Sequence, residues 1–150
     1  MSLEDLYSEI ILDHFKNPRN AGIIEHAEIR SEGANESCGD EVTIFAHVND
    51  DGKIEDIRFS GHGCAISQAS ASMMTERMKG KSLSEAEEFI EHLRKMLTGE
   101  EPFSETGEFD ELAALRGVAK FPMRVKCATL AWTTLKMGIE GYRNNHSREP

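Results

Sequence analysis

Three cysteines and one aspartate are the residues of this chain best suited to chemistry. Cys38 and Asp40 stand one glycine apart in "ESCGDEVTI", Cys64 follows Gly-His-Gly in "SGHGCAISQ", and Cys127 lies in "MRVKCATLAW". Residues i and i+2 of an extended backbone project to the same side, so Cys38 and Asp40 can reach one ion. Three thiolates and a carboxylate would complete the tetrahedral shell that zinc prefers.

Two of the cysteines are expected at helix starts. Cys64 stands at a predicted strand-to-helix junction, and Cys127 stands in the first turn of a last helix expected at about 126–143. Exposed backbone N–H groups and the helix dipole favour thiolate over thiol at such positions. Arg124 and Lys126 add positive charge beside Cys127. Both cysteines are therefore expected to be good metal ligands.

Spacing alone leaves another interpretation open. The chain has no C-x-x-C knuckle, and its cysteines are far apart in sequence, unlike those of a zinc finger. Cys64 and Cys127 would then be small buried hydrophobic residues, and Asp40 would be a turn residue. A papain-like Cys–His hydrolase is disfavoured because no recognised signature surrounds any cysteine.

Composition limits the class of protein. The chain has 150 residues, 39% of them hydrophobic, which fits one domain over residues 1–150. A chain of this length buries roughly 68–70% of its unfolded surface, so it should fold without a metal or disulfide. The net charge of −10 argues against nucleic acid and anionic membranes as partners. With no signal-peptide pattern and three cysteines that cannot all pair, we expect a cytoplasmic protein with reduced thiols.

Hydrophobic spacing and turn residues predict an α+β fold. Helices are expected at 3–16, 64–80, 82–97 and about 126–143, strands at about 25–32, 41–48 and 53–61, a hairpin turn at 49–52, and an acidic loop with a short helix at 98–112. Ser82 and Glu85 form a possible capping box. The order predicts a small antiparallel three-stranded sheet packed by an N-terminal helix and several C-terminal helices.

Three motifs resemble those of a known family. "NESCGDEV", "GHGCAISQASAS" and "RVKCATLAW" occur in the order of the cysteine motifs of NifU/IscU iron–sulfur cluster assembly proteins, and "LYSEIILDHFKNPRN" is similar to that family's N-terminal helix and turn. The resemblance implies a compact SufU/IscU-like α+β domain. It also implies that Cys38, Asp40, Cys64 and Cys127 gather at one end as metal ligands.

Two departures are similar to the SufU branch of that family. Lys126 stands where IscU-like scaffolds place a histidine, and the segment between Cys64 and Cys127 looks longer, with extra residues around 98–120. That branch implies a zinc-dependent sulfurtransferase that accepts persulfide sulfur from a SufS-like cysteine desulfurase and passes it to downstream cluster assembly proteins. The resemblance also implies that a partner histidine replaces one cysteine on the zinc.

Roles follow from these expectations. Cys38, on a Gly-flanked loop, is predicted to swing away as the sulfur acceptor while Asp40, Cys64 and Cys127 hold zinc. Arg124 is predicted to steer the partner or stabilise the developing thiolate, with an ordinary solvated arginine as the alternative. Two competing functions remain. One is a non-enzymatic scaffold that holds iron or a [2Fe–2S] cluster through the same residues, and the other is a structural zinc protein.

The remaining histidines and methionines are interpreted as ordinary. His62 could serve as a ligand or proton donor, but a hydrogen-bonded histidine at a strand end is the favoured interpretation. The other isolated histidines on predicted helix or strand faces are His14, His26, His47 and His92. Met73, Met74 and Met78 are expected to pack in the core.

Overall fold

The chain runs through one helix, three strands and then further helices, as the sequence predicts. The computed structural model describes residues 3–102 and 111–147. The elements are α1 (Leu3–Lys16), β1 (Ile29–Asn35), β2 (Asp40–Val48), β3 (Ile54–His62), α2 (Ala65–Met78), α3 (Leu83–Leu97), the 3-10 helix η2 (Leu112–Lys120) and α4 (Pro122–Ser147). The α+β class and the three-stranded sheet are therefore confirmed.

The sheet is antiparallel with β2 in the centre. Its order is β1-β2-β3, and the β1–β2 register pairs Asn35 with Asp40 at one end. On β3, His62 pairs with Glu41. The ends of β1 and β3 therefore lie beside the start of β2. The first two cysteine motifs lie at this end of the sheet.

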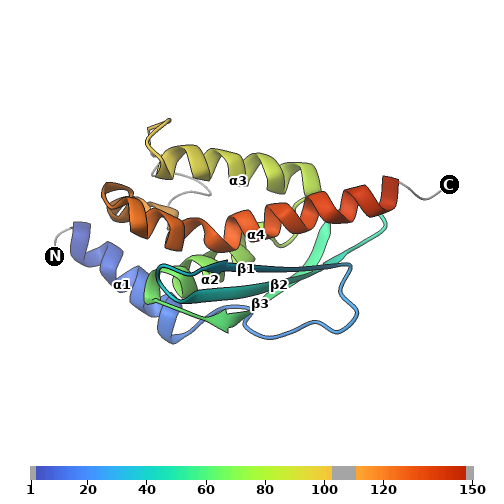
Figure 1. Ribbon diagram of the computed structural model, residues 1–150, viewed down its shortest axis with the longest axis horizontal. Helices are drawn as coiled ribbons and strands as arrows, with labels where there is room; N and C mark the ends of the chain where they lie inside the picture. Colours follow the sequence, from blue (N-terminus) through green and yellow to red (C-terminus); the bar gives the residue numbers. More distant parts are fainter. Residues whose placement is uncertain (1–2, 103–110, 148–150) are drawn as a thin grey trace.

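Helices cover one face of this sheet. Helix α4 crosses β1 and β2, α2 packs against α4 and β3, and α3 lies on the far side of α4 (Figure 1). Helix α1 packs on α2 and η2 rather than on the sheet. Gly138 lets α4 approach β1, since a Cβ there would lie 2.7 Å from Ile29 Cγ2 and 2.9 Å from Ser31 Cβ.

The interior between helices and sheet is closely packed. Trp132 of α4 stacks on Phe89 of α3, with 5.7 Å between ring centroids and 18° between planes. The Trp132 indole N–H donates to Ser70 Oγ at 2.8 Å, and Ser70 Oγ donates to the Ala128 carbonyl at 2.6 Å. The predicted burial of the α2 methionines is confirmed for Met73, Met74 and Met78.

The predicted capping box is present at the start of α3, with Ser82 Oγ accepting from the Glu85 N–H and the Glu85 carboxylate accepting from the Ser82 N–H.

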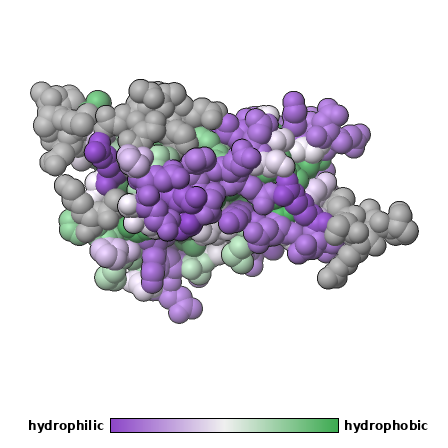
Figure 2. Space-filling model, turned by 90° about the horizontal axis from the view of Figure 1, so that it is seen from above, coloured by the Kyte–Doolittle hydropathy of each residue, from purple (hydrophilic) through white to green (hydrophobic). Residues whose placement is uncertain are grey.

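The outer face of α3 is polar. The surface seen from above, over α3, is mostly hydrophilic (Figure 2). Among the described helices, none is both long and apolar enough to cross a membrane.

Several boundaries differ from the expectation. Helix α4 begins at Pro122 rather than near 126, because proline is favoured at the first helical position. Strand β1 begins at Ile29 rather than near 25, and His26 just before it has a φ of 58°. The sequence predicts a short helix within 98–112, but η2 starts only at Leu112, the last residue of that range, and residues 103–110 lie outside the described part.

Candidate metal centre

Cys38 lies in the tight turn that joins β1 to β2. The Cys38 N–H donates to the Asn35 carbonyl at 3.2 Å, and the Gly39 N–H donates to the Glu36 carbonyl at 3.3 Å. Gly39 has a φ of 68°, which a residue with a side chain rarely adopts. The thiol of Cys38 is half-buried, and its one polar contact among the described residues is with Cys127 Sγ, at 3.1 Å.

Asp40 opens β2 and is almost completely buried. Its side chain is held from two sides: Oδ1 accepts from the Cys64 backbone N–H at 2.8 Å, and Oδ2 lies 3.5 Å from Asn35 Nδ2. Gly63 permits this contact, because a Cβ on Gly63 would collide with Asp40 Oδ1. A carboxylate with both oxygens positioned in this way is preorganised to bind a cation.

Cys64 is the N-cap residue of α2. Its Sγ accepts from the Ser67 backbone N–H at 3.5 Å, and its carbonyl begins the helix by accepting from the Gln68 N–H at 3.1 Å. The expected helix-start position is therefore confirmed for Cys64, and the helix dipole favours a thiolate there. Cys64 Sγ lies 3.9 Å from Asp40 Oδ2.

The same expectation is wrong for Cys127. Because α4 begins at Pro122, Cys127 lies in the second turn, beyond the free N–H groups of the helix start. Its side chain is 2% exposed. Burial and contacts with Cys38, then Asp40 and Cys64, raise the pKa of the Cys127 thiol above its ordinary value. A divalent cation among these groups would reverse that effect, since it stabilises the thiolate directly.

The predicted residues converge at one end of the molecule. The ligand atoms of Cys38, Asp40 and Cys127 all lie within 4.8 Å of one another. Cys64 is not within that limit for all three, but it adjoins the set through Asp40. With the Cys38 and Cys127 sulfurs 3.1 Å apart, one ion with Zn–S bonds of about 2.3 Å reaches both. The donor set therefore fits zinc, and metal binding by these four residues stays a prediction.

Asn35 is a site residue that the sequence analysis missed. The side chain is buried, and its Nδ2 lies 3.5 Å from Asp40 Oδ2 and 3.5 Å from Cys127 Sγ. The hairpin could have identified Asn35, because the register that pairs Asn35 with Asp40 places both residues beside Cys38 in the turn. Asn35 is suited to orient two of the candidate ligands.

Two other predicted residues have polar or ring partners outside the cluster. The exposed Arg124 places its guanidinium carbon 5.5 Å from the Phe121 ring centroid and, in the described part of the chain, makes no hydrogen bond or ion pair with the four candidate ligands. His62 is exposed, with Nε2 3.1 Å from Glu41 Oε2, as expected of an ordinary histidine. A catalytic role for Arg124 stays a prediction.

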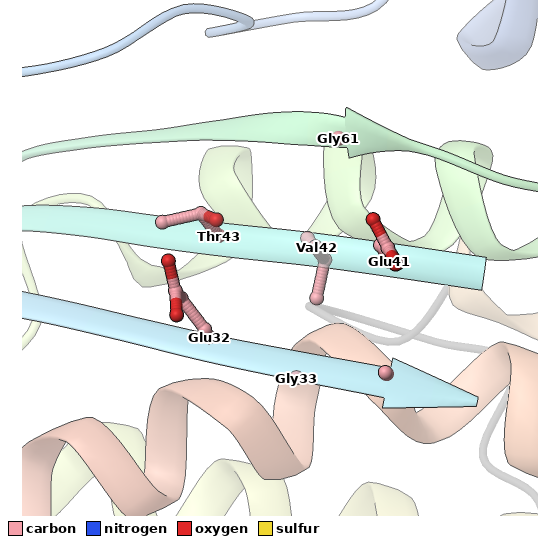
Figure 3. A pocket seen from close by; sticks show the side chains of 7 residues that line it. Glu32, Gly33, Glu41, Val42, Thr43 and Gly61 are labelled. Atoms are coloured by element: carbon pink, nitrogen blue, oxygen red, sulfur yellow. The ribbon is translucent and has the colours of Figure 1, made fainter. Parts of the chain in front are cut away.

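A shallow groove of about 390 Å³ crosses the sheet beside the cluster. Figure 3 shows the Glu32 and Glu41 carboxylates on neighbouring strands along this groove. Its lining residues are Glu32, Gly33, Ala34, Glu41, Val42, Thr43 and Gly61. This lining contains neither thiol nor imidazole, so the groove is separate from the candidate metal centre.

Fold and cluster together define a class of protein: a small α+β domain with three cysteines and one aspartate at one end. The chain matches the NifU-like N-terminal domain over residues 6–149. It therefore belongs to that family.

Two relatives cover nearly the whole chain but have different names. The zinc-dependent sulfurtransferase SufU of Bacillus subtilis is 41% identical over 92% of this chain and 92% of its own length. The iron–sulfur cluster assembly scaffold protein IscU of Thermotoga maritima is also 41% identical, over 93% of this chain and 96% of its own length. Sequence identity alone therefore does not distinguish a sulfurtransferase from a cluster scaffold.

Solved structures share the fold. A crystal structure from Fervidobacterium islandicum AW-1, titled as a cluster assembly scaffold protein for the SUF system, has a TM-score of 0.81 at 41% identity and covers 92% of this chain and 99% of that one. A NifU-like N-terminal structure from Brucella abortus has a TM-score of 0.84 at 22% identity, covering 95% and 97%. At that lower identity the likeness concerns the fold alone.

Proposed function

We propose that this protein is a zinc-dependent sulfur acceptor that takes persulfide sulfur from a cysteine desulfurase in the cytoplasm. The donor set of three sulfurs and one carboxylate supports zinc as the cofactor. The relative named as a zinc-dependent sulfurtransferase supports the activity. Lys126, in place of the histidine of IscU-like scaffolds, supports transfer over cluster building.

The distribution of N–H donors around the cluster carries this proposal. Cys64 Sγ accepts from the Ser67 N–H, and Cys127 Sγ lies 3.5 Å from the Asn35 amide. Asp40 receives the Cys64 N–H. Among the described residues, Cys38 Sγ has no N–H donor. A thiolate without N–H hydrogen bonds keeps its charge on sulfur and is the stronger nucleophile, so Cys38 is the ligand that reacts.

The proposed reaction is a sulfur transfer without net oxidation or reduction. The Cys38 thiolate attacks the outer sulfur of the desulfurase persulfide. A sulfur–sulfur bond forms to Cys38, the sulfur–sulfur bond of the donor breaks, and the donor cysteine leaves as a thiolate. Cys38 then carries the persulfide for the next acceptor. The turn around Gly39, rather than a helix or strand, lets Cys38 move toward the partner.

The other three ligands stay in place during this step. When bound, zinc keeps the thiolates deprotonated. Asp40 is fixed by the Cys64 N–H, and Cys64 by its N-cap position, so neither has the freedom of the turn. A histidine of the desulfurase would occupy the position that Cys38 leaves, as the resemblance to the SufU branch implies. Arg124, exposed near the start of α4, would face the incoming partner.

Desulfurase turnover with matched variants tests the proposal. Added wild-type protein should stimulate a SufS-like cysteine desulfurase. Cys38→Ala and Cys38→Ser should abolish that stimulation, although Cys38→Ser should retain some zinc because its hydroxyl stands near the same position. Ser37→Ala, an exposed neighbour in the same turn, is the control and should stimulate normally. Normal stimulation by either Cys38 variant would refute the assignment.

A scaffold that holds a [2Fe–2S] cluster is the second candidate. Cysteine thiolates are the usual ligands of iron–sulfur clusters, and this chain offers three. The Thermotoga relative is named a scaffold. Purification without oxygen separates the two functions. A colourless protein with about one zinc at the thiolates supports transfer, and a brown protein with sulfur-to-iron charge-transfer absorption supports the scaffold.

A further inference from the structure

A second group of potential ligands lies outside the cysteine centre. His14 on α1, interpreted from the sequence as an isolated, ordinary histidine, is 2% exposed. Its Nε2 contacts Glu111, which directly precedes η2, and lies 3.8 Å from Glu76 Oε1 on α2. The three ligand atoms lie within 4.8 Å of one another. Three separate segments of the chain thus bring one imidazole and two carboxylates together.

The imidazole cannot satisfy both carboxylates. His14 Nδ1 lies 2.8 Å from Ser72 Oγ, so only Nε2 faces the two glutamates. One ring nitrogen offers a single proton, which Glu111 already receives. The 3.8 Å separation from Glu76 exceeds a hydrogen bond, and His14 is the only ion-pair partner of Glu76 in the described part of the chain. Glu76 therefore faces a ring nitrogen whose proton already goes to Glu111.

A divalent cation bound between His14, Glu76 and Glu111 would compensate the negative charge of the two carboxylates. Its charge would offset the repulsion between the two carboxylates, and the Nε2 lone pair would become a ligand in place of a proton donor. Arg77 lies 4.0 Å from Glu111 Oε2, which leaves Oε1 directed toward His14. Both glutamates are about one-third exposed, so water can complete the coordination shell.

The partner of the other ring nitrogen is also characteristic of a metal ligand. A ligating histidine usually holds its second ring nitrogen through a hydrogen bond that fixes the ring orientation. Ser72 Oγ does this for His14, and Ser72 is itself held because its Oγ accepts from the Arg19 backbone N–H at 2.8 Å. The imidazole is therefore fixed before any cation arrives.

We propose that His14, Glu76 and Glu111 form a binding site for a divalent first-row transition metal such as Mn²⁺ or Fe²⁺. One nitrogen and two carboxylate oxygens are harder donors than the thiolates of the cysteine centre and suit these ions. Glu76 follows Cys64 by twelve residues on α2, about 18 Å along the helix axis. The site is distinct from the cysteine centre and does not depend on the proposed sulfur transfer.

A Mn²⁺ titration of the full-length protein followed by electron paramagnetic resonance tests this site. The cysteines are first filled with one equivalent of zinc, which Mn²⁺ does not displace because it binds such ligands most weakly of the series. Binding removes the six-line signal of free Mn²⁺. We expect saturation at one Mn²⁺ per chain, with an affinity reduced about 10-fold or more by His14→Ala or Glu76→Gln.

A matched control and a second measurement make the result decisive. His47→Ala removes a histidine that pairs with a single carboxylate, Glu28, at 2.7 Å, and should bind Mn²⁺ as the wild type does. Mn²⁺ should raise the melting temperature of the wild type but not of Glu76→Gln. If His14→Ala fails to fold, Glu76→Gln decides alone. The absence of saturable binding by the wild type, or unchanged binding by Glu76→Gln, would leave His14 and Glu111 as an ion pair only and overturn the proposal.

Discussion

The side-chain amide of Asn35 lies between two candidate ligands, 3.5 Å from Asp40 Oδ2 and 3.5 Å from Cys127 Sγ. An amide nitrogen carries two protons and can serve both acceptors at once. Asn35 therefore links the carboxylate at the start of β2 to the sulfur on α4. The two ligands that it contacts are among the three that should stay on the metal when Cys38 leaves.

Removal of this amide should weaken zinc binding. Asn35→Ala should lower zinc affinity about 10–100-fold, the usual cost of losing a group that orients metal ligands. Asn35→Asp should cost more, because it replaces a donor with a negative charge beside Asp40. Competition with a chromogenic chelator measures both. The control is Asn17→Ala, at an exposed residue directly after α1. Equal affinities for all three variants would contradict the role.

Gly63 should be required for the position of Asp40. A Cβ at residue 63 would collide with Asp40 Oδ1 and lie 2.7 Å from Ser67 Oγ and 3.0 Å from Asp40 Cα. Gly63→Ala should therefore cost about 1–3 kcal/mol of stability and reduce zinc affinity. Urea unfolding and chelator competition provide the two measurements. Gly117→Ala meets no atom within 4 Å and is the matched control, so identical behaviour of the two variants would argue against this steric account.

The fold was largely predictable because its signals are local. Alternating apolar residues produced the strands, and Ser82 with Glu85 marked the start of α3. The start of α4 was misplaced because Pro122 was not recognised as a first helical residue. That four-residue error also placed Cys127 near free N–H groups, when tertiary burial controls its thiol instead.

The candidate site was predictable only in its ligands. Cys38, Asp40 and Cys127 were chosen by residue type and by resemblance to a family, and the structure brings them together. Asn35 was missed and His14 was interpreted as ordinary because their contacts join distant segments of the chain. Asn35 meets Cys127 across 92 residues, and His14 meets Glu111 across 97. A periodicity or a short motif does not encode such contacts.

Zinc binding should release protons. Burial and neighbouring acidic groups raise the pKa of Cys127, so without metal this residue is a thiol at neutral pH. Because the metal binds the thiolate, the proton must leave, and zinc affinity should rise with pH. Calorimetry in buffers of different ionisation enthalpy should detect about one proton or more per zinc at neutral pH. In Cys127→Ser the release should fall, and a wild type without net proton release would contradict the prediction.

Removal of zinc should leave the fold intact. Zinc-finger peptides unfold without metal because about 10–16 kcal/mol of binding free energy is also their folding free energy. Here the stacked pair of Trp132 and Phe89 lies in a core of sheet and helix residues that includes the fully buried Ile44 and Ile57. Chelator-treated protein should therefore keep its helical circular dichroism, its cooperative melting and the fluorescence of Trp132, its only tryptophan.

Phe89→Ala provides the comparison, because it should cost about 3–5 kcal/mol by opening a cavity beside Trp132. If the metal is functional, chelation should lower the melting temperature less than Phe89→Ala does. If chelation instead abolishes cooperative melting, zinc is a structural element of this protein, and sulfur transfer by release of Cys38 loses its physical basis, since release of one ligand would then loosen the whole fold.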